Sequence, residues 1–296
     1  MRLSYRTETY KCRLMRIATH QMYTSYLVRA FSWKGKGGSQ TAVVVDADHL
    51  SLAQRKQIAR VSGTSHTVFM EAPLSPVPIL HFFTPAGELL NCAHATLAAQ
   101  FIRWHVLEKG KEVSQLPETS HPHRLFFRQG PVSFLPMPTA SLDFLLSSLG
   151  LQVTQLDNAF PPVLASAGNF RVLLGVGQGV LDKLTPDFTS LANWSGRHGV
   201  IGCFVYSFSS EVSGQQTWAR MFAPAIGINE DAVNGNSCGC LAVYTKRSLH
   251  VFQGNWTGHP GLVEADLEEQ QGVYQCYLGG EALLEKKIIQ RVPDLS

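Results

Sequence analysis

A thiol, an imidazole and the start of an apolar helix lie together in the stretch "TPAGELLNCAHATLAA", residues 84–99. Cys92 and His94 precede a run of small and apolar residues that is typical of a helix buried on most sides. The unpaired N–H groups and the positive dipole end of a helix start favour a bound carboxylate and lower the pKa of a nearby thiol. The stretch therefore predicts a site for anion binding or proton transfer.

A second stretch, "RMFAPAIGINEDAVNGNSCGCLAVY" at residues 220–244, repeats these features in the same order. With "FF" at 82–83 included in the first stretch, each has a strand, a Phe-X-Pro turn, a loop with an acid, a cysteine and a helix that begins with small residues. Cys92 and Cys238 are 146 positions apart, counting from 92 to 238, which is close to half of the 296 residues. This spacing is typical of an internal duplication. We expect two pseudo-symmetric units that direct two helix starts at one cleft.

Hydrophobic periodicity predicts the elements that position these residues. A helix is expected over 51–63, with Ser51 as N-cap and Gly63 near its end, and a more apolar helix over 94–110. Runs of β-branched and aromatic residues predict strands at 26–31, 41–47, 66–71 and 78–84. The second half is expected to form helices at 141–150 and 238–249, with strands between and after them.

Composition restricts the class of partner. The chain is 45% hydrophobic and 16% charged, and its net charge of +3 is scattered, which argues against a nucleic-acid groove or a basic membrane patch. No apolar stretch approaches the ~18 to 20 residues that span a bilayer. The six cysteines include one Cys-X-Cys pair and no CxxC motif, so neither a disulfide framework nor a zinc site is indicated. We expect a cytoplasmic protein with reduced thiols and a small-molecule partner.

Residues 1–25 are expected to be an extension that is disordered or loosely attached. The first 24 residues contain five Lys and Arg residues and a single acid, Glu8, a composition shared with transit peptides. A tail, or a start codon placed upstream, is the simpler interpretation. The remaining chain is expected to divide into domains at 26–125 and 126–296, with the final strand as a candidate to return to the first domain.

From Tyr26 to the C-terminus the chain resembles the PhzF-like family, the relatives of a phenazine-biosynthesis isomerase within the diaminopimelate-epimerase-like fold. "HFFTPAGELLNCAHATLAA" is similar to the family's FTP-x-x-E-x-x-x-C-G-H-A-T, and "ARMFAPAIGINEDAVNGN" to its R-M-F-A-P-x-x-G-I-x-E-D-P-x-T-G-[SN]. "GTSHTVF" is similar to its S-E-T-x-F motif. The resemblance implies an α+β fold with two pseudo-symmetric domains, each a curved, mostly antiparallel sheet or barrel around a central helix. It also implies a homodimeric isomerase whose active site lies between these domains. Such an enzyme transfers protons on its substrate without a metal or cofactor.

Several motif positions depart from the family pattern. His66 holds the place of the Glu that is the family's usual acid/base group. The other departures are Ala93 for Gly, Ala232 for Pro, Asn234 for Thr, and "GSQ" at Gly38 to Gln40 for G-N-P. His94, Asp231, Gly235 and Asn236 keep matching positions.

His66 is therefore the main candidate for the catalytic acid/base. An imidazole with a pKa near 6.5 can accept and return a proton at neutral pH without a large shift. Asp231 is expected to polarise the substrate or to orient His66. The residues expected to bind substrate are Ser65, His94, Ala95, Thr96, Gly235, Asn236 and Ser237.

The predicted function is a cofactor-independent isomerase that moves a proton on a small carboxylated metabolite. The motif departures are also compatible with a repurposed isomerase or cyclase of secondary metabolism. One alternative is an amino-acid racemase or epimerase that uses the two thiols of Cys92 and Cys238 as catalytic groups. Another is a catalytically silent member of the family that acts as a binding or scaffold protein. His66 would then only pack or form hydrogen bonds.

Overall fold

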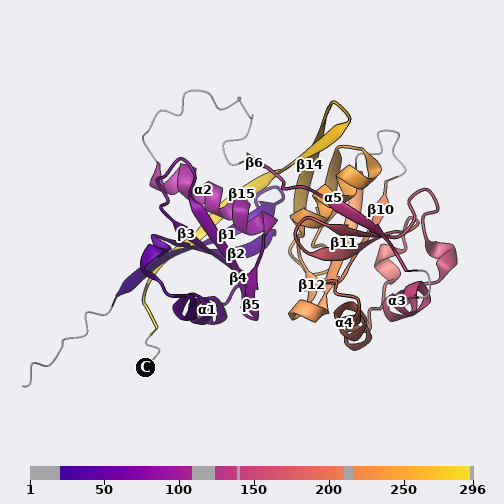
Figure 1. The fold of residues 1–296 in the computed structure, drawn as a ribbon, viewed down its shortest axis with the longest axis horizontal. Helices are drawn as coiled ribbons and strands as arrows, with labels where there is room; N and C mark the ends of the chain where they lie inside the picture. Colours follow the sequence, from indigo (N-terminus) through magenta and orange to yellow (C-terminus); the bar gives the residue numbers. More distant parts are fainter. Residues whose placement is uncertain (1–20, 109–123, 139–140, 210–215, 294–296) are drawn as a thin grey trace, which may run out of the picture.

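The computed structural model describes residues 21–108, 124–138, 141–209 and 216–293. Most of the expected N-terminal extension, residues 1–20, lies outside the described residues. Figure 1 shows two lobes side by side, with α2 within the first lobe and α5 within the second. In the described residues no helix is long and apolar enough to cross a bilayer.

The first lobe contains five strands and two α-helices in the described residues. The strands are β1 (Met22–Ser32), β2 (Ser39–Val45), β3 (His66–Glu71), β4 (Ile79–Thr84) and β5 (Gly87–Leu89). The helices are α1 (Leu52–Val61) and α2 (Ala93–Ile102), and α2 continues into a π-helical segment, η2 (Arg103–Leu107).

The second lobe contains the remaining elements. Its strands are β6 (Arg124–Arg128), β7 (Ser133–Pro136), β8 (Val163–Ser166), β9 (Phe170–Gly175), β10 (Cys203–Phe208), β11 (Gln216–Ala223), β12 (Ile228–Asp231), β13 (Leu249–Gln253), β14 (Gly261–Gln270) and β15 (Val273–Arg291). Its helices are α3 (Leu142–Leu149), α4 (Phe188–Arg197) and α5 (Gly235–Thr245).

The strands form one continuous mixed sheet that runs through both lobes. The long strand β15 joins them, because its first part pairs antiparallel with β14 and its last part, Glu281–Arg291, pairs antiparallel with β1. Most neighbouring strands are antiparallel, but β2 pairs in parallel with β3, β9 with β10, and β11 with β13. Parallel neighbours need a crossover connection, which contains α1, α4 and α5, respectively.

Each lobe is built around one apolar helix. Helix α2 contacts β1, β2 and β3, and α5 contacts β13, β14 and β15. Helix α2 contains four Ala residues, α5 contains two Gly and two Cys residues, and most residues of both helices are buried. Small side chains let strands approach a helix closely on several sides, which suits the central place of both helices.

Local sequence signals explain several of the helix ends. Ser51 caps α1 in a capping box with Gln54, as the sequence predicts for the start of this helix. Gly150, with φ of 71°, ends α3 in the left-handed region. Helix α4 is not predicted from the sequence, although Asp187 caps it by accepting a hydrogen bond from the Ser190 backbone N–H.

The predicted helix over 238–249 is displaced. It begins at Gly235, because the Asn234 side chain accepts hydrogen bonds from the N–H and hydroxyl of Ser237. It ends at Thr245, and the predicted end, Leu249, is the first residue of β13. Cys238 is therefore the fourth residue of the helix and not its first.

The two helix starts meet closely at Gly235. A Cβ atom at this position would lie 2.7 Å from the Ala93 Cβ and 3.1 Å from the Phe31 ring. We therefore expect Gly235→Ala to lower the free energy of unfolding by about 1–3 kcal/mol through overpacking. Gly196→Ala in α4 is the matched control, because no atom lies within 4 Å of a Cβ there. Alanine should stabilise that helix by about 0.5–1 kcal/mol.

Urea denaturation of the two variants measures both effects. Equal stability of the two variants would contradict the close approach of the helix starts.

Candidate active site

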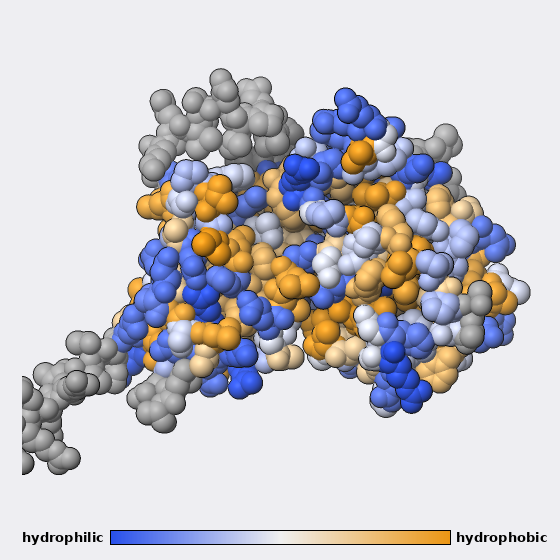
Figure 2. All heavy atoms as spheres, in the orientation of Figure 1, coloured by the Kyte–Doolittle hydropathy of each residue, from blue (hydrophilic) through white to orange (hydrophobic). Residues whose placement is uncertain are grey.

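A small cavity of about 40 Å³, partly open to solvent, lies between the lobes, at the starts of α2 and α5. The first lobe contributes His66, Asn91, Cys92, Ala93 and His94, and the second contributes Asn169, Arg171, Asp231, Asn234, Gly235 and Asn236, among other residues. The space-filling view in Figure 2 shows a furrow between the lobes, with hydrophobic and hydrophilic residues interspersed over the visible face. The predicted cleft with two helix starts is therefore present.

Three side chains of the first lobe form a compact cluster. The rings of His66 and His94 are 4.1 Å apart between centroids and nearly perpendicular. Nε2 of His94 lies 3.2 Å from Sγ of Cys92, and Nδ1 of His66 lies 3.0 Å from the hydroxyl of Ser65. His66, Cys92 and His94 are each at most 5% exposed. The first residue of β3 and the first residues of α2 are thus held together.

Burial sets the protonation states of this cluster. It lowers the pKa of His66 to about 4 and the pKa of His94 well below its usual 6.5, so both rings are neutral at neutral pH. Burial also raises the pKa of the Cys92 thiol. Backbone N–H groups at the helix start oppose this effect, as the sequence predicts, but they do not outweigh the loss of water.

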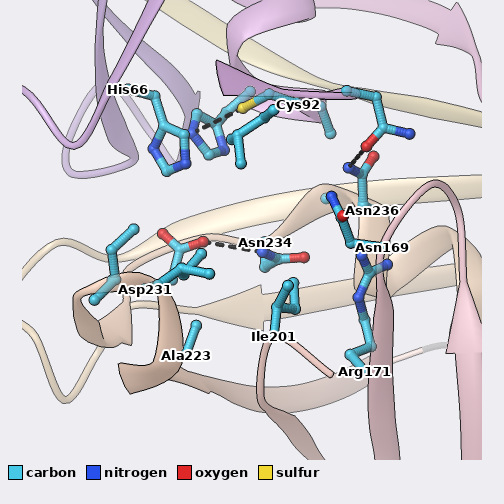
Figure 3. Close-up of a pocket in the computed structure, with 16 residues that line it drawn as sticks. His66, Cys92, Asn169, Arg171, Ile201, Ala223, Asp231, Asn234 and Asn236 are labelled. Carbon is cyan, nitrogen blue, oxygen red and sulfur yellow. Dashed lines mark hydrogen bonds between the residues drawn. The ribbon is translucent and has the colours of Figure 1, made fainter. Parts of the chain in front are cut away.

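Asp231 faces this cluster from the second lobe. Figure 3 shows its carboxylate across the cavity from the His66 ring. One carboxylate oxygen accepts a hydrogen bond from Nδ2 of Asn234 at 3.0 Å. Burial raises the pKa of Asp231 from 3.8 to about 6, although the hydrogen bonds from Asn234 and Val233 oppose the shift. At neutral pH the site therefore contains a buried carboxylate opposite two neutral imidazoles.

The Asp231 charge should cost stability. The folded-state pKa is higher than the unfolded-state pKa, so the protein loses stability as the pH rises from about 4 to about 6. Asp231→Asn keeps an acceptor for Asn234 and removes the charge. We expect this variant to be more stable than the wild type above pH 6, by up to about 3 kcal/mol, and equally stable below pH 4.

Urea denaturation at several pH values measures this difference, with the exposed Asp143→Asn as control. A stability difference that does not depend on pH would contradict the raised pKa.

The opposite side of the cavity contains a buried cation that the sequence analysis missed. Arg171 in β9 is 1% exposed, its Nε has no hydrogen-bond partner, and its Nη1 lies 3.5 Å from the Cys240 sulfur. In the described residues it forms no ion pair. Figure 3 places Arg171 beside Asn169 and Asn236, on the side away from His66. This arrangement suits an anionic ligand.

Amide side chains link the two lobes at this side. Asn236 donates from Nδ2 to Oδ1 of Asn91 at 2.9 Å, and Nδ2 of Asn91 donates to the Ala167 carbonyl. The sequence analysis predicted Asn236 for this side. It missed Arg171, a single Arg in the apolar strand "FRVLLG", and Asn91, the residue before Cys92. Arg171 lies in no recognisable motif, and Asn91 occupies an unspecified position of the motif around Cys92.

Cys238 does not reach the cavity lining. Its side chain is fully buried, with Sγ 3.2 Å from the Asn234 carbonyl and 3.1 Å from Nε2 of Gln253. Cys92 is the N-cap residue of α2, whereas the N-cap residue of α5 is Asn234, four positions before Cys238. In the structure the position that corresponds to Cys92 is therefore Asn234. The expected correspondence of Cys92 with Cys238 was wrong by about one helical turn. Burial also raises the pKa of Cys238 well above its usual value.

The predicted binding residues divide into two groups. His94, Gly235 and Asn236 line the cavity. Among the described lining residues, Ser65, Ala95, Thr96 and Ser237 are absent. Thr96 donates to the Cys92 carbonyl at 2.9 Å, Ser237 donates to Asn234 at 2.7 Å, and Ala95 is fully buried. Ser65 instead orients His66. These four residues hold the helix starts and the His66 ring in place.

Comparison with known families agrees with the motifs. Residues 28–287 match the family described as "Phenazine biosynthesis-like protein", PhzC-PhzF. The chain belongs to this family. A relative from Escherichia coli strain K12, named uncharacterized isomerase YddE, is 31% identical over 263 residues, which cover 81% of this chain and 88% of the relative.

Two further proteins support the class and the fold. The trans-2,3-dihydro-3-hydroxyanthranilate isomerase of Pseudomonas chlororaphis is 28% identical, over 83% of this chain and 91% of the relative. The crystal structure of a Bacillus anthracis PhzF-family protein is 22% identical, with a TM-score of 0.77, and covers 91% of this chain and 99% of that protein. The predictions of an α+β PhzF-like fold and of an isomerase are confirmed.

Proposed function

We propose that this PhzF-family isomerase moves a proton on a small carboxylated metabolite by general acid/base catalysis in the cavity between the lobes. The observation that supports this most is the opposition of His66 and Asp231, which come from different lobes and line one buried cavity. His66 is neutral at neutral pH and Asp231 is ionised, because their pKa values are about 4 and about 6. The cavity therefore holds a neutral base on one side and a carboxylate on the opposite side.

The reaction follows from these two states. The neutral His66 ring takes a proton from a substrate carbon and becomes an imidazolium, which the Asp231 carboxylate stabilises. The ring then returns the proton to another carbon, or to the other face, which gives a double-bond shift or an epimerisation. The backbone N–H groups at the two helix starts stabilise the negative charge that develops in between.

The substrate carboxylate is proposed to lie at the Arg171 side. A guanidinium without an acidic partner, beside two Asn side chains, can form charge-assisted hydrogen bonds with it. The reacting carbon then lies toward His66. Ligand pockets usually measure about 300–1,000 Å³, so separation of the lobes around this cavity of about 40 Å³ is part of the proposal.

The exact substrate is proposed to differ from the substrate named for the Pseudomonas chlororaphis relative. His66 in place of the family's Glu changes the charge and reach of the base, and four other motif positions also differ. A repurposed isomerase or cyclase of secondary metabolism fits this pattern. We retain a cytoplasmic homodimer as part of the proposal, and the free, buried state of the described cysteines suits a reducing compartment.

The test is proton exchange in D₂O, followed by mass spectrometry, on a panel of small cyclic and amino carboxylic acids. The corresponding methyl esters are the matched control ligands. We expect deuterium in at least one acid and none in its ester. Exchange that disappears in Cys92→Ala/Cys238→Ala but persists in His66→Gln would support the two-thiol racemase. Acids that bind without any exchange would support the silent binding protein.

A further inference from the structure

His66, Cys92 and His94 form a cluster with the chemistry of a metal site. One ligand atom of each residue lies within 4.8 Å of the other two. The three residues come from the start of β3 and the start of α2, and all are buried. The base and helix-start roles already assigned to them do not require three donor atoms in one place.

The donor set selects a class of metal. Two imidazoles and one thiolate suit a borderline divalent ion such as Zn²⁺, which forms bonds of about 2.0–2.3 Å with them. Two ligands on one tetrahedral ion then lie roughly 3.5 Å apart. The 3.2 Å separation of His94 Nε2 and Cys92 Sγ is already close to that value.

We propose that His66, Cys92 and His94 bind a zinc-like divalent cation, with a fourth coordination position that faces the cavity. The metal replaces the proton of the Cys92 thiol, which is released to the solvent, so the thiolate and the two neutral imidazoles leave a net charge of +1. The Asp231 carboxylate across the cavity offsets this charge.

The neighbours of the cluster also suit a metal. Because Nδ1 of His66 is paired with the Ser65 hydroxyl, Nε2 is the nitrogen available to the metal. Hydrogen bonds of this kind orient a ligating imidazole and tune its affinity. The 28-residue separation between His66 and His94, counted along the chain, explains why no spaced motif revealed the cluster.

Metal binding and proton transfer would exclude each other. A His66 ring that coordinates a cation cannot accept a substrate proton, so the metal-loaded protein is expected to be inactive in proton exchange. This consequence rests on the proposed function, whereas metal binding itself does not. The site would then make the isomerase sensitive to free zinc.

The test uses Co²⁺ as a spectroscopic probe of the full-length protein after treatment with a chelator. We expect one equivalent of Co²⁺ to produce tetrahedral d–d bands and a thiolate-to-cobalt charge-transfer band, and Zn²⁺ to abolish both. Cys92→Ser should lose the charge-transfer band. Ser65→Ala should keep all three ligands and weaken binding by about 10- to 100-fold.

His49→Gln, at an exposed position outside the cluster, is the control and should bind Co²⁺ like the wild type. Circular dichroism identifies any variant that fails to fold, and X-ray absorption of the wild-type zinc complex should show one sulfur and two nitrogen ligands. The proposal is overturned if the wild type gives no charge-transfer band, or if the band persists in Cys92→Ser. Both outcomes are independent of whether any substrate is found.

Discussion

His66→Gln is expected to lower kcat for proton transfer by about 10²- to 10⁴-fold, the usual contribution of a general acid/base. Glutamine can form hydrogen bonds in the same place, for example with Ser65, but it cannot accept and return a proton at neutral pH. KM should change little, because His66 lies on the side of the cavity away from Arg171. Deuterium exchange at saturating substrate measures the effect.

His49→Gln is the matched control for His66→Gln, because it makes the same substitution at an exposed position outside the cavity. Its exchange rate should equal that of the wild type. A His66→Gln variant with wild-type kcat would contradict the assignment of the base.

Arg171→Met is expected to raise KM for the carboxylated substrate by about 10- to 150-fold. This range follows from the loss of a charge-assisted hydrogen bond worth about 1.5–3 kcal/mol. The kcat value should fall less, since Arg171 lies away from His66. Arg171→Lys keeps the cation but loses the planar donor pair, so its KM should lie between those of the wild type and Arg171→Met.

Thermal stability separates this binding role from a structural one. Arg171 forms no ion pair in the described residues, so replacing it with an apolar residue of similar length should not lower Tm. A lower Tm with an unchanged KM would show that Arg171 holds the fold together rather than the substrate.

The sequence was sufficient to predict the α+β fold, because the motif resemblance and the apolar helices around Ala95 and Leu241 are strong signals. It also predicted that His66, His94 and Asp231 would meet. These residues lie directly beside strand or helix ends, and the duplicated pattern brings those ends together. The positions of these three residues depend on where strands and helices begin and end, which hydrophobic periodicity in the sequence can indicate.

Other features depended on packing, which periodicity does not indicate. The cap at Asn234 set the start of α5 and moved Cys238 away from the cavity, and burial raised the pKa of Cys92 despite the helix start. Arg171 is the second residue of β9, where one charged residue in an apolar strand forms no recognisable motif. Its proximity to Asn236 arises from long-range pairing of β9 with the rest of the second lobe.

The pH profile of proton exchange in the wild type and in Asp231→Asn tests most directly whether His66 and Asp231 act together. His66, Cys92 and His94 face Asp231 across the cavity, and Asn234 is hydrogen-bonded to it. Because the Asp231 carboxylate must be ionised to stabilise the imidazolium, the wild-type rate should fall as the pH decreases through about 6. Asp231→Asn should be slow at every pH and lack this transition. A transition near pH 6 that persists in Asp231→Asn would contradict the pairing of His66 with Asp231.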